Sequence, residues 1–150
     1  MNNNELNQRL ATFDVVELNG PVSEAQIATA EEQLGMGFPP QYREFLSNFG
    51  SGGVDSEDFI GLNGPDYLDI VKLTSRLRAR NNPLPLWLLP LRSDGFGNYD
   101  CLDLQQPTTY GEFSVVQWNH EAGENQQCEV LAQSFDTWFE SVLRMIEENA

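Results

Sequence analysis

The spacing of the apolar residues changes near residue 80, and this change limits the folds that the chain can adopt. Before it, apolar side chains recur every three or four positions, as on one face of a helix. After it, they fall in short runs rich in β-branched and aromatic residues, which are typical of strands. Helices followed by neighbouring strands predict an α+β fold. We therefore expect one antiparallel or mixed sheet of about four to six strands, flanked by N-terminal helices and a closing C-terminal helix.

Capping signals indicate where the first helices begin and end. The apolar spacing predicts a first helix over about residues 4–13. Ser23 can form a capping box with Gln26 at the start of the second helix, and Gly35 suits the left-handed position after its end. Pro39-Pro40 marks the start of the third, because proline fits only the first turn of a helix.

The segment after the third helix is rich in glycine and acidic residues. We interpret residues 51–58 as a mobile acidic loop, followed by a short strand over Phe59–Leu62. A fourth helix is expected from about residue 65 to Arg80, with Tyr67 facing the core. That helix carries half of the chain's eight cations, which are Lys72, Arg76, Arg78 and Arg80. We interpret them as a solvated helix face near the negative end of the helix dipole.

The strands expected in the second half are short. They cover residues Leu86–Leu91, Tyr99–Leu104, Phe113–Trp118 and Glu129–Ala132. The glycines of residues 94–98 predict a hairpin connection between the first two. Ser134 is the expected N-cap of the closing helix.

The charge of the chain excludes some classes of partner. The 150 residues, the length of one domain, carry 23 acidic and eight basic side chains, for a net charge of −15. Binding to nucleic acid or to an anionic membrane needs cations, so neither is expected. A basic protein partner and simple solubility both agree with this charge, and the charge alone does not separate them.

No residue pattern predicts catalysis, a cofactor or a metal site. His120 is the only histidine, and a histidine that hydrogen-bonds locally at a strand end is favoured over a general base. Cys101 and Cys128 could form a disulfide, but two free thiols are favoured. With no catalytic pattern, we do not expect an enzyme. The start, Met1–Glu5, has no targeting signal, and Leu84–Leu91 is too short to span a bilayer, so we expect a cytoplasmic protein.

Four segments, in this order, resemble the SUKH superfamily. They are Ile27–Gly35 with Phe38–Leu46, Ser93–Asp103, Val115–Glu121, and Ala132–Phe135 with Trp138. The resemblance spans about residues 22–143, and Phe38, Phe49-Gly50 and Asn119 depart from the common pattern. The superfamily contains yeast cell-wall synthesis regulators and bacterial immunity proteins. Membership in the bacterial branch implies a cytoplasmic protein that binds and blocks a secreted toxin domain, such as a nuclease or deaminase.

A toxin that acts on nucleic acid needs a basic cleft, which would attract this acidic chain. We expect the toxin to contact acidic or protruding residues of three segments, which are Asp55, Glu57 and Asp58; Asp94, Phe96 and Asn98; and Glu121, Glu124 and Asn125. Two alternatives stay open, a regulatory scaffold like the fungal branch and a small ligand bound at the sheet.

Overall fold

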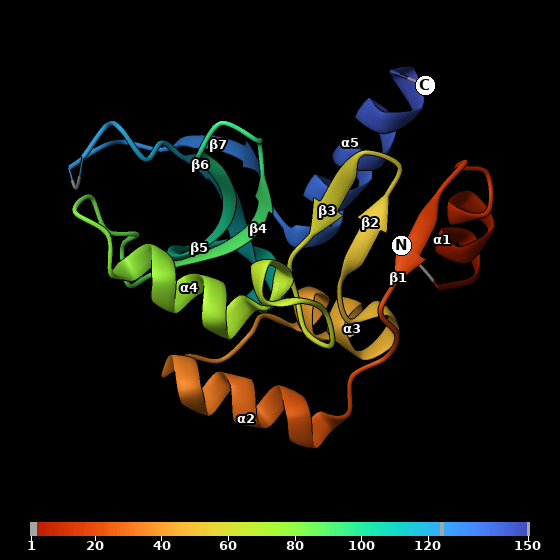
Figure 1. Ribbon diagram of the computed structural model, residues 1–150, viewed down its shortest axis with the longest axis horizontal. Coiled ribbons are helices and arrows are strands. Elements are labelled where there is room, and N and C mark those ends of the chain that lie inside the picture. Colours follow the sequence, from red (N-terminus) through yellow and green to blue (C-terminus); the bar gives the residue numbers. More distant parts are fainter. Residues whose placement is uncertain (1–2, 124, 150) are drawn as a thin grey trace.

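The chain forms two small antiparallel sheets with helices packed around them (Figure 1). The computed structural model describes residues 3–123 and 125–149. The α-helices are α1 (Asn3–Leu10), α2 (Glu24–Leu34), α3 (Pro40–Phe49), α4 (Ile70–Arg78) and α5 (Phe135–Glu148), and the 3-10 helices are η1 (Asp66–Leu68) and η2 (Thr109–Gly111). The strands are β1 (Val16–Leu18), β2 (Gly52–Val54), β3 (Glu57–Phe59), β4 (Leu88–Ser93), β5 (Tyr99–Pro107), β6 (Phe113–Trp118) and β7 (Glu129–Ala132).

The α+β prediction is confirmed, but the strands are divided between two sheets. One sheet has the order β1-β2-β3 and the other the order β4-β5-β6-β7, and every pairing within them is antiparallel. The four-stranded sheet agrees with the four to six strands expected from the sequence, and the three-stranded sheet is an addition to it. The two sheets meet where the amide of Ile60, just after β3, donates to the carbonyl of Leu91 in β4 at 2.9 Å.

The helix ends predicted from capping residues are confirmed. The Gln26 amide donates to Ser23 Oγ at 3.2 Å, and the Ser23 amide donates to Gln26 Oε1 at 3.0 Å, which completes the capping box. Gly35 ends α2 in the left-handed conformation, with φ 72°. The first helix is shorter than expected, because it ends at Leu10 and the chain then turns towards β1.

Residues 51–58 are not a loop but contain a hairpin of β2 and β3. The glycines that predicted a loop are required by the pairing with β1, a strand that we did not predict. At Gly52 a Cβ atom would collide with the backbone carbonyl of Glu17 in β1, and φ is 141°. Glycine therefore lets β1 approach closely and form this three-stranded sheet.

The fourth helix also begins later than predicted. The carboxylate of Asp69 accepts hydrogen bonds from the amides of Val71 and Lys72, each at 3.0 Å, and so caps α4. Residues before this cap form the separate turn η1, in which Leu68 is buried. Tyr67, which we expected in the core, is 58% exposed for this reason.

Aromatic rings from α3, β3 and α5 fill the junction between the sheets. Phe59 of β3 lies edge-to-face against Phe139 of α5, with ring centroids 4.8 Å apart. Phe45 of α3 contacts the same ring at 5.5 Å. Each of these three side chains is at least 95% buried, so the two sheets share one continuous core.

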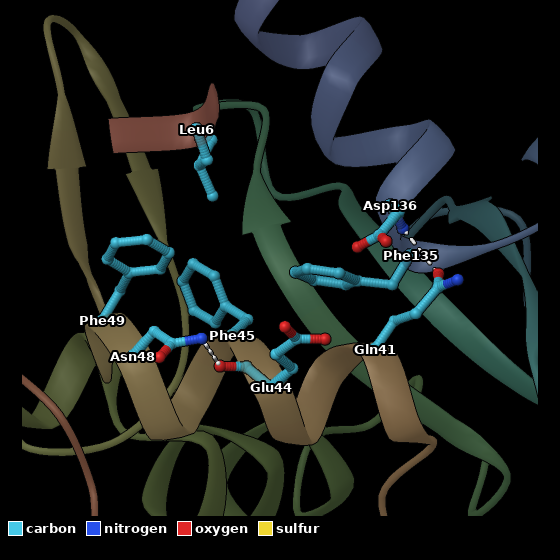
Figure 2. A pocket seen from close by; sticks show the side chains of 8 residues that line it. All are labelled: Leu6, Gln41, Glu44, Phe45, Asn48, Phe49, Phe135 and Asp136. Atoms are coloured by element: carbon cyan, nitrogen blue, oxygen red, sulfur yellow. Dashed lines mark hydrogen bonds between the residues drawn. The ribbon is translucent and has the colours of Figure 1, made fainter. Parts of the chain in front are cut away.

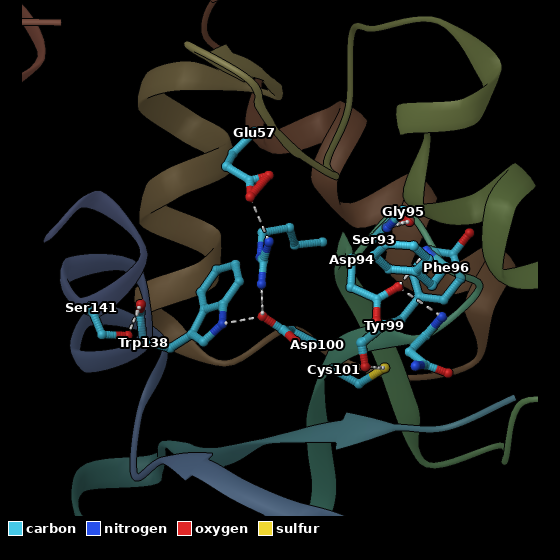
Figure 3. A network of polar contacts seen from close by, with 12 residues as sticks. Glu57, Ser93, Asp94, Gly95, Phe96, Tyr99, Asp100, Cys101, Trp138 and Ser141 are labelled. Atoms are coloured by element: carbon cyan, nitrogen blue, oxygen red, sulfur yellow. Dashed lines mark hydrogen bonds and ion pairs between the residues drawn. The ribbon is translucent and has the colours of Figure 1, made fainter. Parts of the chain in front are cut away.

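A buried polar network crosses the same junction (Figure 3). Asp100 of β5 is 2% exposed and accepts hydrogen bonds from Trp138 Nε1 of α5 at 2.9 Å and from Arg92 Nε of β4 at 3.1 Å. Arg92 also pairs with Glu57 of β3, with 2.9 Å between Nη1 and Oε1. The four side chains thus link both sheets to the closing helix.

Replacing Arg92 with Leu should lower the free energy of unfolding by about 3–5 kcal/mol, because Asp100 would remain buried without its cation. Urea denaturation of the purified protein measures this change. The triple variant Arg92→Met, Asp100→Asn, Glu57→Gln removes the buried charges together and should recover much of the loss. Equal losses in the single and triple variants would show that packing, and not charge pairing, gives the network its importance.

Candidate partner-binding site

His120 has a structural role in the turn between β6 and β7. Its Nδ1 atom lies 2.9 Å from Asn98 Oδ1, and its amide donates to the same oxygen at 3.2 Å. The imidazole covers Gly97, where a Cβ atom would come within 2.6 Å of the ring. These contacts confirm the expected local hydrogen bonding of the histidine. In residues 3–123 and 125–149, no group of three His, Cys, Asp or Glu side chains could hold a metal ion.

The two cysteines are free thiols, as favoured from the sequence. Burial raises the pKa of Cys101 well above its ordinary value, with a smaller effect from the neighbouring Asp100. Burial also raises the pKa of Cys128. Since the thiolate is the nucleophilic form, neither cysteine is activated for catalysis. Within the described part of the chain, no helix is both long and apolar enough to cross a membrane.

The hollow between α3 and α5 is too small for a ligand (Figure 2). It encloses about 20 Å³ and is lined by apolar residues such as Phe45 and Phe135, together with polar Gln41 and Asp136. One water molecule needs most of such a volume. The side chains in Figure 2 therefore belong to the packing of α3 and α5, with Leu6 of α1 beside them.

A larger hollow lies on the outer face of the three-stranded sheet, and we call it the acidic groove. It has a volume of about 230 Å³ and is lined by Val15, Glu17, Asn19, Gly52, Gly53, Asp55, Asp58, Pro65, Tyr67 and Leu68. Glu17 pairs with Gly53, and Gly53 pairs with Asp58, so the three residues form one row across the strands. Because glycine has no side chain, the Asp58 carboxylate can lie over the middle strand, where a Cβ atom at Gly53 would come within 3.0 Å of Asp58 Oδ1.

Asp55 lies at the β2–β3 turn, at one end of the acidic groove. Its Oδ1 atom accepts a hydrogen bond from the Val15 amide at 2.9 Å, and its own amide donates to the Val15 carbonyl at 2.7 Å. Its φ of 50° is left-handed, a conformation that Asp tolerates better than most residues. The turn therefore holds this third carboxylate in place.

The carboxylates of the acidic groove affect one another. Partial burial, and to a smaller extent the nearby carboxylate of Glu17, raises the pKa of Asp58 above its ordinary value of 3.8. The charged form of Asp58 is thus less favourable here than in water. A cation placed near Glu17 and Asp58 would offset this penalty by favouring the charged form of both, so the acidic groove is suited to a positively charged group.

A second hollow adjoins the acidic groove, and we call it the arginine pocket. It has a volume of about 250 Å³ and is lined by Asp58, Ile60, Tyr67, Leu68, Leu73, Arg76, Arg80, Ser93 and Tyr99. Asp58, Tyr67 and Leu68 line both hollows. The exposed ring of Tyr67 therefore lies between a negatively charged hollow and one that contains two arginines.

The residues predicted from the acidic segment separate in the structure. Asp55 and Asp58 line the acidic groove. Glu57 precedes Asp58 on β3, so its side chain points to the opposite face of the sheet, where it pairs with Arg92. We therefore assign Glu57 to the buried network.

The residues predicted from the 94–98 turn lie beside the arginine pocket, because Ser93 and Tyr99 at the two ends of the turn line it. The Asp94 carboxylate accepts hydrogen bonds from the amides of Phe96 at 2.7 Å and Asn98 at 3.1 Å, and so shapes the turn (Figure 3). Phe96 is 83% exposed and protrudes.

The third predicted segment joins the same turn through the contact between Asn98 and His120. Glu121 directly follows this contact and its side chain is exposed. Asn125 is exposed as well. Glu124 lies outside the described residues.

Sequence reasoning missed Glu17 and Tyr67 as site residues. The alternation in Val16-Glu17-Leu18 is the one signal of an outward carboxylate, and three residues are too few to predict a strand from it. The sequence places Tyr67 in the core, because it predicts that the fourth helix begins before this residue. The sequence predicts Arg76 and Arg80 as cations on a solvated helix face, but it does not show that they line a hollow.

Comparison with known proteins supports the resemblance found in the sequence. The family model described as SMI1-KNR4 cell-wall (SUKH_5) matches residues 4–144. The fold is similar to a crystal structure of a protein from Pseudomonas syringae pv. tomato, with a TM-score of 0.57 and 18% sequence identity over 80% of this chain and 87% of that chain. At this identity the likeness concerns the fold alone. No curated protein matches the sequence.

Replacing Asp58 with Asn should stabilise the protein at neutral pH. Because the pKa of Asp58 is raised in the folded state, the unfolded chain loses this proton first as the pH rises above 3.8. The aspartate therefore costs stability above its folded pKa and costs none below 3.8. Urea midpoints of wild type and Asp58→Asn at about pH 7 and about pH 3.5 measure the difference.

The exposed Asp14, two residues before β1, provides a matched control. The Asp14→Asn variant should change the midpoint less than Asp58→Asn does at neutral pH. An Asp58→Asn variant less stable than wild type at neutral pH would contradict the assigned direction of the pKa shift.

Proposed function

The chain belongs to the SMI1-KNR4 (SUKH) family, and from this premise we propose that it is a cytoplasmic immunity protein that binds a toxin domain and covers the basic cleft of that toxin. The observation that carries the proposal is the row of Glu17, Gly53 and Asp58 on the outer face of the small sheet. It offers two carboxylates on the two outer strands of the small sheet, with no side chain on the middle strand between them, in a chain of net charge −15.

The acidic groove is suited to one basic side chain of the toxin. Its volume of about 230 Å³ can admit a guanidinium or an ammonium group with part of its aliphatic stem. Carboxylates form short, charge-assisted hydrogen bonds with guanidinium groups. Val15 and Tyr67, which are 52% and 58% exposed, provide apolar surface beside the charges. Tyrosine on this chain and arginine on the partner are among the residue types that contribute most to binding energy.

The overall charge supports the same proposal through the rate of association. A toxin that acts on nucleic acid binds phosphates with a basic cleft. The field of an acidic protein can raise the association rate by about 10–1,000-fold at low salt. Blocking the cleft in this way requires no catalysis by the immunity protein, which agrees with a histidine and two thiols that are held in structural contacts.

Neutralising the acidic groove should slow binding. The triple variant Glu17→Gln, Asp55→Asn, Asp58→Asn keeps the shape of the site, and asparagine keeps the hydrogen bond acceptor that Asp55 offers to Val15. We expect its association rate with a candidate toxin domain, taken from a reading frame next to that of this chain, to fall about tenfold at low salt. Its salt dependence should also be weaker than that of wild type. Surface plasmon resonance between about 50 and 300 mM salt measures both.

A control variant removes three exposed carboxylates from other elements, Glu32→Gln in α2, Glu129→Gln in β7 and Glu148→Gln in α5. It changes the net charge equally and should slow association less than the groove variant. Co-expression of the wild-type chain should protect cells from the toxin domain. Failure to bind this domain or to protect from it would overturn the proposal and favour a regulatory scaffold instead.

A further inference from the structure

Among the described residues of this acidic chain, only some of the basic side chains form ion pairs. Of eight basic side chains, four form ion pairs among the described residues, and they are Arg9, Arg43, Lys72 and Arg92. Arg78 is partly buried and donates to the carbonyl of Leu86 at 2.9 Å. Arg76, Arg80 and Arg144 form no ion pair in the described part of the chain, although acids outnumber bases 23 to 8 and the Asp66 carboxylate, which pairs with Lys72, also attracts Arg76 more weakly.

Two of these three arginines line the arginine pocket. Arg76 and Arg80 are four residues apart, so they point from the same side of α4 and of the turn that follows it. Arg76 donates one hydrogen bond to the carbonyl of Asp66 at 3.2 Å. Both side chains are exposed and keep further donors available.

Apart from Asp58 and Ser93, the other residues that line the arginine pocket are aliphatic or aromatic. Ile60, Leu68 and Leu73 are each at least 95% buried and form its floor, and the rings of Tyr67 and Tyr99 line it as well. Apolar surroundings strengthen the attraction between an arginine and an anion, because they exclude water from the contact. The pocket can therefore hold an anionic group that carries an apolar stem.

The position of Asp58 limits the charge of that anion. This carboxylate lines the pocket together with the two arginines. A phosphate would bring about two negative charges beside it, whereas a carboxylate brings one and matches the planar guanidinium geometry. An aspartate or glutamate side chain therefore fits the pocket better than a phosphate group.

We propose that the arginine pocket binds an acidic side chain of the protein partner, next to the basic side chain that enters the acidic groove. This inference rests on the proposed function, since it concerns the same partner. The partner then presents a positive and a negative group on either side of Tyr67. The arrangement gives the docking a fixed orientation, because the reversed orientation places like charges together at both hollows.

The change in binding affinity when Arg76 and Arg80 are removed has one sign under this proposal and the opposite sign under simple electrostatic attraction. If only the net charge attracts a basic toxin, removing two cations from this chain should speed association and strengthen binding. If Arg76 and Arg80 hold a carboxylate of the partner, removing them should instead weaken binding by faster dissociation. The two explanations therefore predict opposite changes in affinity.

The test compares the double variant Arg76→Gln, Arg80→Gln with Arg144→Gln, which changes an exposed arginine on α5 that forms no ion pair with residues 3–123 or 125–149. Surface plasmon resonance with the same candidate toxin domain should show dissociation about tenfold faster for the double variant. Its association rate should be unchanged or slightly higher. The Arg144→Gln variant should match wild type within about twofold, and thermal melting should show that all the variants are folded.

The outcomes distinguish the two proposals. A wild-type chain that does not bind the toxin domain overturns both. Binding that is weakened by the neutralised acidic groove, but is unchanged or strengthened by the double arginine variant, overturns only the acidic side chain in the arginine pocket. If dissociation is faster as expected, Lys scanning of the toxin's acidic surface should find one position whose effect is not additive with Arg80→Gln.

Discussion

The structure depends on one buried carboxylate, that of Asp100, which is held by Arg92 and by the indole of Trp138. A bulge between Pro90 and Arg92 changes the strand register, so that Arg92 lies directly opposite Asp100. The same guanidinium reaches Glu57 in the other sheet. Leaving any of these charges buried alone would cost several kcal/mol, so the network fixes β3 against β4. This position places Asp58 in the same pocket as Ser93 and Tyr99, so the arginine pocket follows from it.

The elements that the sequence predicted well are those with local signals. The capping box of Ser23, the left-handed Gly35 and the N-cap Ser134 each act within a few residues, and all three are confirmed. Strand β1 and the hairpin of β2 and β3 have three residues per strand and form through contacts between distant segments. Gly52 there signalled a loop, whereas its absent side chain allows the close approach of β1.

Only part of the candidate site could be predicted from the sequence, because local signals predict residues better than contacts between distant segments do. Asp55 and Asp58 are predicted as contact residues because they belong to an acidic segment, and both line the acidic groove. The sequence also placed Glu57 with them, because it does not show on which side of β3 a carboxylate lies. Glu57 differs from Asp55 and Asp58 in its burial, its register and its ion pair with Arg92. Likewise, a basic helix face and a basic pocket have the same sequence pattern.

Asp58 links the two hollows through its protonation as well as its position. Its raised pKa means that the free protein holds this carboxylate where ionisation is costly. A cation in the acidic groove would lower that pKa, so binding of the cation and loss of the proton favour each other. An anion in the arginine pocket would act in the opposite direction on the same carboxylate. A partner that presents both charges therefore leaves the ionisation of Asp58 less changed than a partner that presents only a cation, and its affinity depends less on pH.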